Sequence, residues 1–436
     1  MQLLSNPTTL HIQPGLPAEL GQGSDAGRFA AGTWTPGRDA SGVVNAVSWN
    51  LVPRRQGVRV AGTRLDALDG KVQAALPGWR DWGVEGWEGV MKAWNGFTID
   101  TAGQRLWLMA AGGHAASSNN GIYRFDVLKM AWDIEKLPSD PAQWSAAYTG
   151  KRNGGTFTSC EESRAQFDLR AVAKALLPAN DWFWDELFWD RAPTSRHVYS
   201  ATAYVPETNE LVMSARRLWR YSLSTRRWTY KRQLEDGARP YAGSGIYGIY
   251  DEARGEYLVG GYGDAIYNSV GFKLSSNQWV PWSQPTGNNV IADCRHGRTW
   301  TAIAPPEYPD WTYSRDGQYW LYDLDSRTVK RSGRVQYGSG LQRTDFANGR
   351  DFYDGFALCY IPTLNRYWLF TRLRDGSRPI LELDPTTEPW TLRRQSLAGV
   401  DPDPFPVLCR KMVYMPSLDA VLLADTASKD FWLYRF

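Results

Sequence analysis

Short apolar runs return about every fifty residues along the chain, and each follows an aromatic or apolar residue and a polar turn. In segments 204–210, 250–256, 360–366 and 414–420, a tyrosine ends one run and the following residues reverse the chain. This pattern predicts a β-hairpin at each place. The strand-ending residues of the seven predicted copies are Trp49, Ile99, Tyr204, Tyr250, Ile303, Tyr360 and Tyr414.

The residues after each hairpin predict three further strands. The second strand is continuously apolar, as in 106–109 and 367–370, which is typical of a strand buried on both faces. The third strand alternates and often ends in an acidic or small residue that starts a turn. The predicted fourth strands carry a single tryptophan, which is Trp132, Trp228, Trp279 or Trp390, with Trp79 or Trp82 in the first copy. Four antiparallel strands repeated radially predict an all-β propeller, a fold that protects strand edges.

The two ends of the chain are expected to share the last blade. The chain stops at Phe436, which ends a third strand, and residues 31–36 around Trp34 resemble the fourth strands 227–229 and 389–391. We therefore predict a propeller over 31–436 that the Trp34 strand closes, with seven blades, or six because the first and fifth copies are weak. Residues 1–30 are expected to form an extended arm that docks on a neighbouring subunit or lacks fixed structure.

One segment, 138–196, interrupts the repeat and is predicted to be an insertion. A capping-box pattern at 159–162, apolar residues on one face and Pro178 predict a helix over about 161–177. An aromatic cluster follows it, composed of Trp182, Phe183, Trp184, Phe188 and Trp189. These rings either cover the propeller or form candidate anchors for a partner, because large aromatics dominate interface hot spots.

The paired glycines at 112–113 and 260–261, with the tyrosine and tryptophan that follow them, resemble kelch repeats of the galactose-oxidase-like propeller type. Segments 112–126 and 195–199 are also similar to kelch-like virion proteins of tailed bacteriophages. The resemblance implies a non-enzymatic structural or attachment protein of a phage particle, such as a tail, fibre or capsid-surface component. Its implied partners are other virion proteins in a larger oligomeric assembly, and a host surface glycan.

Two enzyme classes and a cellular kelch scaffold are the alternatives. A copper site like that of galactose oxidase needs histidines on the propeller axis, but His114, His197 and His296 fall in different copies without ligand spacing. A glycan-active enzyme needs two carboxyl groups flanking a sugar bond. The acidic candidates Asp264, Asp293 and Asp354 are interpreted as turn residues. No catalytic, metal or cofactor residue is therefore assigned.

Composition adds constraints on location and partners. A formal net charge of +3 and a pI near 8.5 are too mild to indicate nucleic-acid binding. The four cysteines, Cys160, Cys294, Cys359 and Cys409, are widely spaced and are predicted to be free thiols. The glycine pattern at 243–248 leads into a predicted strand, so it lacks the helix of a dinucleotide site. With no signal peptide or membrane span in the sequence, we expect synthesis in a host cytoplasm and location in the virion.

Overall fold

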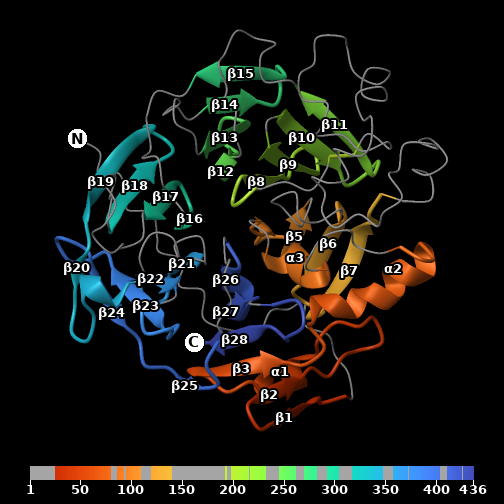
Figure 1. Ribbon diagram of the computed structural model, residues 1–436, viewed down its shortest axis with the longest axis horizontal. Helices are drawn as coiled ribbons and strands as arrows, with labels where there is room; N and C mark the ends of the chain where they lie inside the picture. Colours follow the sequence, from red (N-terminus) through yellow and green to blue (C-terminus); the bar gives the residue numbers. More distant parts are fainter. Residues whose placement is uncertain are drawn as a thin grey trace, which may run out of the picture.

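The structure is a computed structural model. It describes residues 25–79, 86–92, 95–109, 119–139, 192–193, 198–215, 217–231, 245–261, 270–281, 292–303, 317–346, 357–371, 373–402, 410–424 and 426–436. Within these residues, β-sheets are arranged radially around a common centre, and one edge strand of each sheet, here called its first strand, lies nearest to that centre (Figure 1).

Five sheets, here called blades, are each built from four consecutive strands that pair antiparallel in sequence order. The blades consist of β4 (Thr98–Asp100), β5 (Arg105–Met109), β6 (Ile122–Asp126) and β7 (Ala131–Lys136); β8 (Thr202–Val205), β9 (Glu210–Ala215), β10 (Arg217–Ser222) and β11 (Arg227–Lys231); β12 (Gly245–Asp251), β13 (Glu256–Gly261), β14 (Val270–Lys273) and β15 (Gln278–Pro281); β16 (Ala292–His296), β17 (Thr299–Ile303), β18 (Gln318–Asp323) and β19 (Thr328–Arg334); and β21 (Ala357–Ile361), β22 (Arg366–Phe370), β23 (Ile380–Asp384) and β24 (Thr391–Arg394). A short strand, β20 (Gln336–Tyr337), adds to the last blade by pairing parallel with β24.

A seven-stranded mixed sheet combines strands from both ends of the chain and lies between the first and last blades (Figure 1). Its strands are β26 (Met412–Met415), β27 (Ala420–Leu423), β28 (Trp432–Arg435), β3 (Gln56–Val60), β2 (Thr33–Thr35), β1 (Arg28–Ala30) and β25 (Ala398–Gly399). The antiparallel pairing of β28 with β3 places Leu433 opposite Val58. Both side chains are fully buried, so this junction is part of the hydrophobic core.

The prediction of seven blades is wrong, because the described residues form five. The first predicted copy is largely helical, with α1 (Ala46–Asn50), η1 (Leu65–Leu68), α2 (Asp69–Ala75) and α3 (Gly86–Lys92). Trp49 lies in α1 and Trp79 follows α2, while Trp82 lies outside the described residues. Leu65, Leu68 and Val72 are buried at the three- and four-residue spacing of a helix, a periodic signal that the repeat had obscured.

The fifth predicted copy is out of register. Ile303 was expected to end a first strand, yet it ends β17, the second strand of its blade. The hairpin lies earlier, between β16 and β17, where Gly297 has a positive φ of 54°. The other five anchors lie in the first strands of their sheets, and the tryptophans of β7, β11 and β15 lie in fourth strands as expected.

Trp34 does not pair with the last third strand, so the predicted closure of the ring by its strand is not confirmed. Trp34 lies in β2, opposite Val60 in a parallel pairing with β3, and β3 occupies the edge of β28. The Trp34 ring is fully buried against Trp49, with a centroid distance of 5.2 Å, and its Nε1 donates to the Ser48 carbonyl at 3.1 Å. The contacts with α1 thus hold this ring.

The arm and the insertion are described only in part. Residues 28–30 of the predicted arm form β1, which pairs antiparallel with β2. The predicted helix over 161–177 lies outside the described residues, as does the cluster of Trp182, Phe183, Trp184, Phe188 and Trp189. The described residues also contain the short helices η3 (Arg343–Asp345) and η5 (Pro416–Leu418).

The hairpins between third and fourth strands use the acidic or small residue predicted there. Asp126 Oδ1 accepts the Lys129 backbone N–H at 3.1 Å, Ser222 Oγ accepts that of Thr225 at 3.1 Å, and Asp384 Oδ1 accepts that of Thr386 at 2.9 Å. Asp323 Oδ1 accepts two, from Asp325 at 2.7 Å and Ser326 at 3.0 Å. Each side chain thereby satisfies turn donors that the ladder leaves free.

Replacing Gly57 tests the junction between β3 and β28. A Cβ at Gly57 would lie 2.2 Å from the Val400 carbonyl oxygen and 2.5 Å from Trp432 Nε1, whereas one at Gly70 in α2 meets nothing within 4 Å. We expect Gly57→Ala to lower the free energy of unfolding by roughly 1–3 kcal/mol. Gly70→Ala should raise it by roughly 0.5–1 kcal/mol. Urea unfolding of both variants checks this, and an unchanged Gly57→Ala would contradict the described junction.

Asp323 should make folding sensitive to acid. Lys330 and the backbone N–H of Ser326 lower the pKa of the Asp323 carboxyl to about 2, below its usual value of 3.8. Because the folded-state pKa is depressed, the stabilisation is complete above about pH 4 and is lost as the pH falls toward 2. Asp323→Asn should therefore be less stable than the wild type at pH 6, with the gap closing by pH 2 to 3 in urea titrations. The matched control is Asp133→Asn, at a half-exposed carboxylate, which should change the free energy of unfolding at pH 6 by at most about 1 kcal/mol.

Candidate functional site

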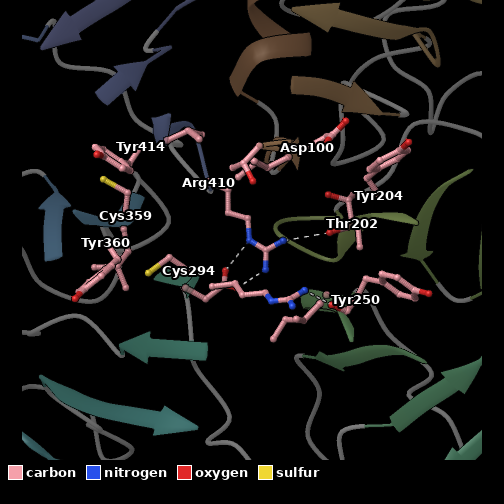
Figure 2. Close-up of a pocket in the computed structure, with 18 of the residues that line it drawn as sticks. Asp100, Thr202, Tyr204, Tyr250, Cys294, Cys359, Tyr360, Arg410 and Tyr414 are labelled. Carbon is pink, nitrogen blue, oxygen red and sulfur yellow. Dashed lines mark hydrogen bonds and ion pairs between the residues drawn. The ribbon is translucent and has the colours of Figure 1, made fainter. Parts of the chain in front are cut away.

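A cavity of about 430 Å³ lies on the central axis, where the first strands of the sheets meet (Figure 2). Neighbouring first strands run in the same direction, since Asn95 bridges Tyr199 and Ser200 bridges Tyr247 in parallel fashion. Their starts therefore gather at one end of the axis and their hairpin turns at the other. Exposed turn residues such as Ala102 and Pro206 lie at the second end, which we call the mouth. The first end, which we call the floor, is formed by buried polar groups.

Arg410 forms the centre of the floor and connects three sheets. It lies two residues before β26, and its Nε donates to Asp293 Oδ1 in β16 at 3.2 Å while a second nitrogen pairs with Oδ2. A third nitrogen donates to the Thr202 carbonyl oxygen in β8 at 3.1 Å. Figure 2 shows the guanidinium in the middle of the cavity, turned toward Thr202. Such a fork-shaped pair fixes both side chains in one geometry.

Asp293 is held from a second direction by Trp300, whose Nε1 donates to Oδ2 at 2.9 Å. The Asp293 and Arg410 side chains are 2% and 12% exposed, so this pair is almost dry. The prediction that Asp293 is a turn residue is wrong, because Asp293 lies within β16. Asp264 and Asp354, interpreted in the same way, lie outside the described residues.

Four strand-ending tyrosines surround the mouth. Figure 2 shows Tyr204 and Tyr250 on one side and Tyr360 and Tyr414 on the other. Three of their hydroxyls donate to the side chain five residues later, as follows: Tyr204 to Asn209 at 3.2 Å, Tyr360 to Asn365 at 2.7 Å and Tyr414 to Asp419 at 2.9 Å. The three acceptors have left-handed backbone, with φ of 52°, 51° and 46°, which Asn and Asp tolerate. Three of the tyrosines predicted as hairpin anchors thus lie around the mouth, and the hydroxyl of each closes the hairpin that follows it.

Tyr250 departs from this arrangement because the fifth residue after it is Gly255, with φ of 62° and no side chain to accept a bond. Its hydroxyl hydrogen-bonds Glu207 of the neighbouring blade instead, and burial together with Glu207 raises the pKa of Tyr250. Glu252, at the same mouth, pairs with Arg295, whose NH1 donates to Oε1 at 2.9 Å. Hydroxyls and charges at the mouth are therefore fixed by neighbours within the fold.

Two cysteines line the cavity wall and are free thiols, as predicted for Cys294 and Cys359. Burial raises the pKa of the Cys294 thiol well above its usual value, and nearby Cys359 and Asp293 raise it further. Burial likewise raises the pKa of Cys359. Both are therefore protonated, weak nucleophiles at neutral pH. Cys160 and Cys409 lie outside the described residues.

The histidines considered for copper are only partly described. His296 ends β16 and lies against the Tyr360 ring at a centroid distance of 4.0 Å, and burial lowers the pKa of its imidazole, which is neutral at pH 7. His114 and His197 lie outside the described residues. Within the part of the chain that the structure describes, no group of three His, Cys, Asp or Glu side chains could hold a metal. No helix found there is long and apolar enough to cross a membrane.

No family model and no curated protein matches the chain. A chain of the Mitotic Checkpoint Complex aligns at a TM-score of 0.41 and 8% identity, covering 80% of this chain and 90% of that one. The WD40 β-propeller domain of Doa1 aligns at 0.32 and 9%, covering 54% of this chain and 63% of that one. The radial sheets with parallel first strands decide the fold. The chain is a β-propeller.

U3-55K is another similar structure, at a TM-score of 0.39 and 8% identity, covering 78% of this chain and 80% of that one.

Sequence reasoning located the tyrosines of this propeller's mouth as hairpin anchors but missed Arg410 and the role of Asp293. Arg410 is one of many arginines beside a predicted strand, so nothing in the local pattern marks it. Its partner lies 117 residues away in the sequence.

Removing one partner of the floor ion pair should be costly. Arg410→Met leaves the Asp293 carboxylate buried without its cation, and Asp293→Asn leaves the guanidinium without its anion. Each change should lower the free energy of unfolding by about 3–5 kcal/mol, and the double variant should lose less than the sum. Denaturant titrations of the three variants give the coupling energy.

Glu388→Gln is the matched control, since Glu388 pairs with Arg331 while its side chain is 71% exposed. This change should cost at most about 1 kcal/mol. Strictly additive effects at Arg410 and Asp293 would contradict a floor held together by their pairing.

Proposed function

We propose that this propeller is a non-enzymatic binding protein whose axial cavity is its recognition site. The observation that carries the proposal is that the tyrosine hydroxyls of the mouth and the ion pair of the floor are tied to the scaffold. The tyrosine hydroxyls at the mouth bond to hairpin residues, and Arg410 and Asp293 bond to each other at the floor. A cavity whose walls are fixed in advance binds a ligand without the entropic cost of ordering them.

The state of the reactive side-chain types favours binding over catalysis. Cys294 and Cys359 are buried and protonated, so they are poor nucleophiles. Asp293 accepts hydrogen bonds from Arg410 and Trp300, so both of its carboxylate oxygens are already engaged within the fold. The cavity volume falls in the range of small-ligand sites, roughly 300–1,000 Å³.

We further propose that the chain is a structural or attachment component of a tailed bacteriophage particle, of kelch type, with other virion proteins as partners. This proposal is supported by the sequence resemblance of segments 112–126 and 195–199 to kelch-like virion proteins. The aromatic cluster at 182–189 is the candidate contact with a neighbouring virion protein. An attachment protein that binds a host surface molecule through the cavity combines both proposals.

Quantitative mass spectrometry of purified particles tests the proposed role. Particles from the organism that encodes the chain should contain it at a fixed ratio to the major capsid protein, and a high-salt wash should not remove it. The genes beside its own should encode capsid, portal or tail proteins. A chain found only in the soluble fraction of the host lysate would contradict the particle role.

A further inference from the structure

The floor of the cavity contains hydrogen-bonding groups that the fold does not use. Thr202 is completely buried and lines the cavity, and its Oγ1 has no hydrogen-bond partner among the described residues. A buried hydroxyl without a partner costs free energy, so its presence calls for an explanation. A ligand in the cavity would provide the missing partner.

Arg410, beside Thr202, also has unused donors. A guanidinium group carries five N–H bonds, and the described bonds to Asp293 and Thr202 account for one hydrogen on each of its three nitrogens. The remaining two hydrogens belong to a side chain that lines the cavity. The floor thus offers two N–H donors and one hydroxyl to whatever enters.

The charges of the cavity favour an uncharged ligand. Arg410 is paired with Asp293, and Arg295 is paired with Glu252. An anion at the floor would meet the Asp293 carboxylate, and a cation there would meet the Arg410 guanidinium. One further carboxylate, Asp100, lies at the mouth, where its Oδ1 accepts the Gly103 N–H at 2.7 Å. The Asp100 carboxylate provides an additional hydrogen-bond acceptor for an uncharged ligand.

The walls at the mouth are aromatic. The hydroxyls of Tyr204, Tyr360 and Tyr414 donate to turn residues, which holds the rings in place. The rings therefore contribute hydrocarbon surface to the cavity wall. The face of an aromatic ring is negative and attracts polarised C–H groups. A ring that carries C–H groups on its faces and hydroxyls around its edge fits both the walls and the floor.

We propose that the axial cavity binds a neutral sugar residue at the end of a glycan, with its hydroxyls on Arg410 and Thr202 and its ring against the tyrosines of the mouth. This assignment rests on the proposed binding function and specifies its ligand class. Hydroxyl groups both donate and accept, so they match the N–H donors of Arg410, the hydroxyl of Thr202 and the carboxylate of Asp100.

Saturation-transfer NMR and calorimetry on the full chain test the assignment. The probes are D-glucose, D-galactose, D-mannose and N-acetyl-D-glucosamine, with N-acetylneuraminic acid as an anionic probe and choline as a cationic one, each at millimolar concentration. At least one neutral sugar should bind more tightly than either charged probe. Failure of all four neutral sugars to bind, or tighter binding of a charged probe, overturns the proposal.

Thr202→Val tests whether the sugar binds at the floor of the cavity. It removes the unpartnered hydroxyl with almost no change in shape, so sugar affinity should fall roughly three- to tenfold, while the thermal midpoint stays the same or rises. Thr202→Ser keeps the hydroxyl and should keep the affinity. Thr301→Val is the matched control, because the Thr301 hydroxyl bonds Tyr367 at 2.8 Å away from the cavity lining. That variant should lose thermal stability but bind sugar normally.

Unchanged affinity in a folded Thr202→Val variant would also overturn the proposed site. The outcome is separable from that of the particle experiment. A chain that is present in particles but binds no neutral sugar refutes the ligand assignment alone. Sugar binding by a chain that is absent from particles refutes the particle role alone.

Discussion

The axial cavity depends on the contact between Arg410 and Asp293. Arg410 lies two residues before β26 and Asp293 lies in β16, while the third bond reaches β8, so a single side chain connects three sheets. Both charges are almost fully buried, and burying either alone would be strongly unfavourable. The pairing therefore constrains how these sheets approach the axis and keeps the floor polar while the walls above it are aromatic and aliphatic.

A short-range hydrogen bond that recurs along the chain shapes the mouth of the cavity. In three sheets, a tyrosine at the end of the first strand donates to an Asn or Asp five residues later, in the left-handed turn. The bond closes the hairpin and also fixes the ring at the mouth. One short sequence motif thus serves the local turn and the shared cavity, because every first strand ends at the same end of the axis.

The buried thiols and the unpartnered Thr202 hydroxyl have different consequences although they line the same cavity. Burial keeps Cys294 and Cys359 protonated, and a thiol behaves as a small hydrophobic group that needs no strong hydrogen-bond partner. A hydroxyl does need one. The cavity therefore holds one unsatisfied hydroxyl beside spare donors on Arg410, a combination that the proposed sugar would complete.

The sequence by itself determined the hairpins. Alternation, strand-ending tyrosines and the acidic turn residues located five of the seven anchors, because pairing between adjacent strands depends on residues within one short segment. Tertiary structure alone decided the choice of β3 rather than the Trp34 strand beside β28, and the pairing of Arg410 with Asp293. These features join segments more than one hundred residues apart, where the free energy comes from burial and charge pairing in the assembled ring. No local pattern records such contacts, so an arginine at the floor of a cavity has the same sequence context as an arginine on a solvated turn.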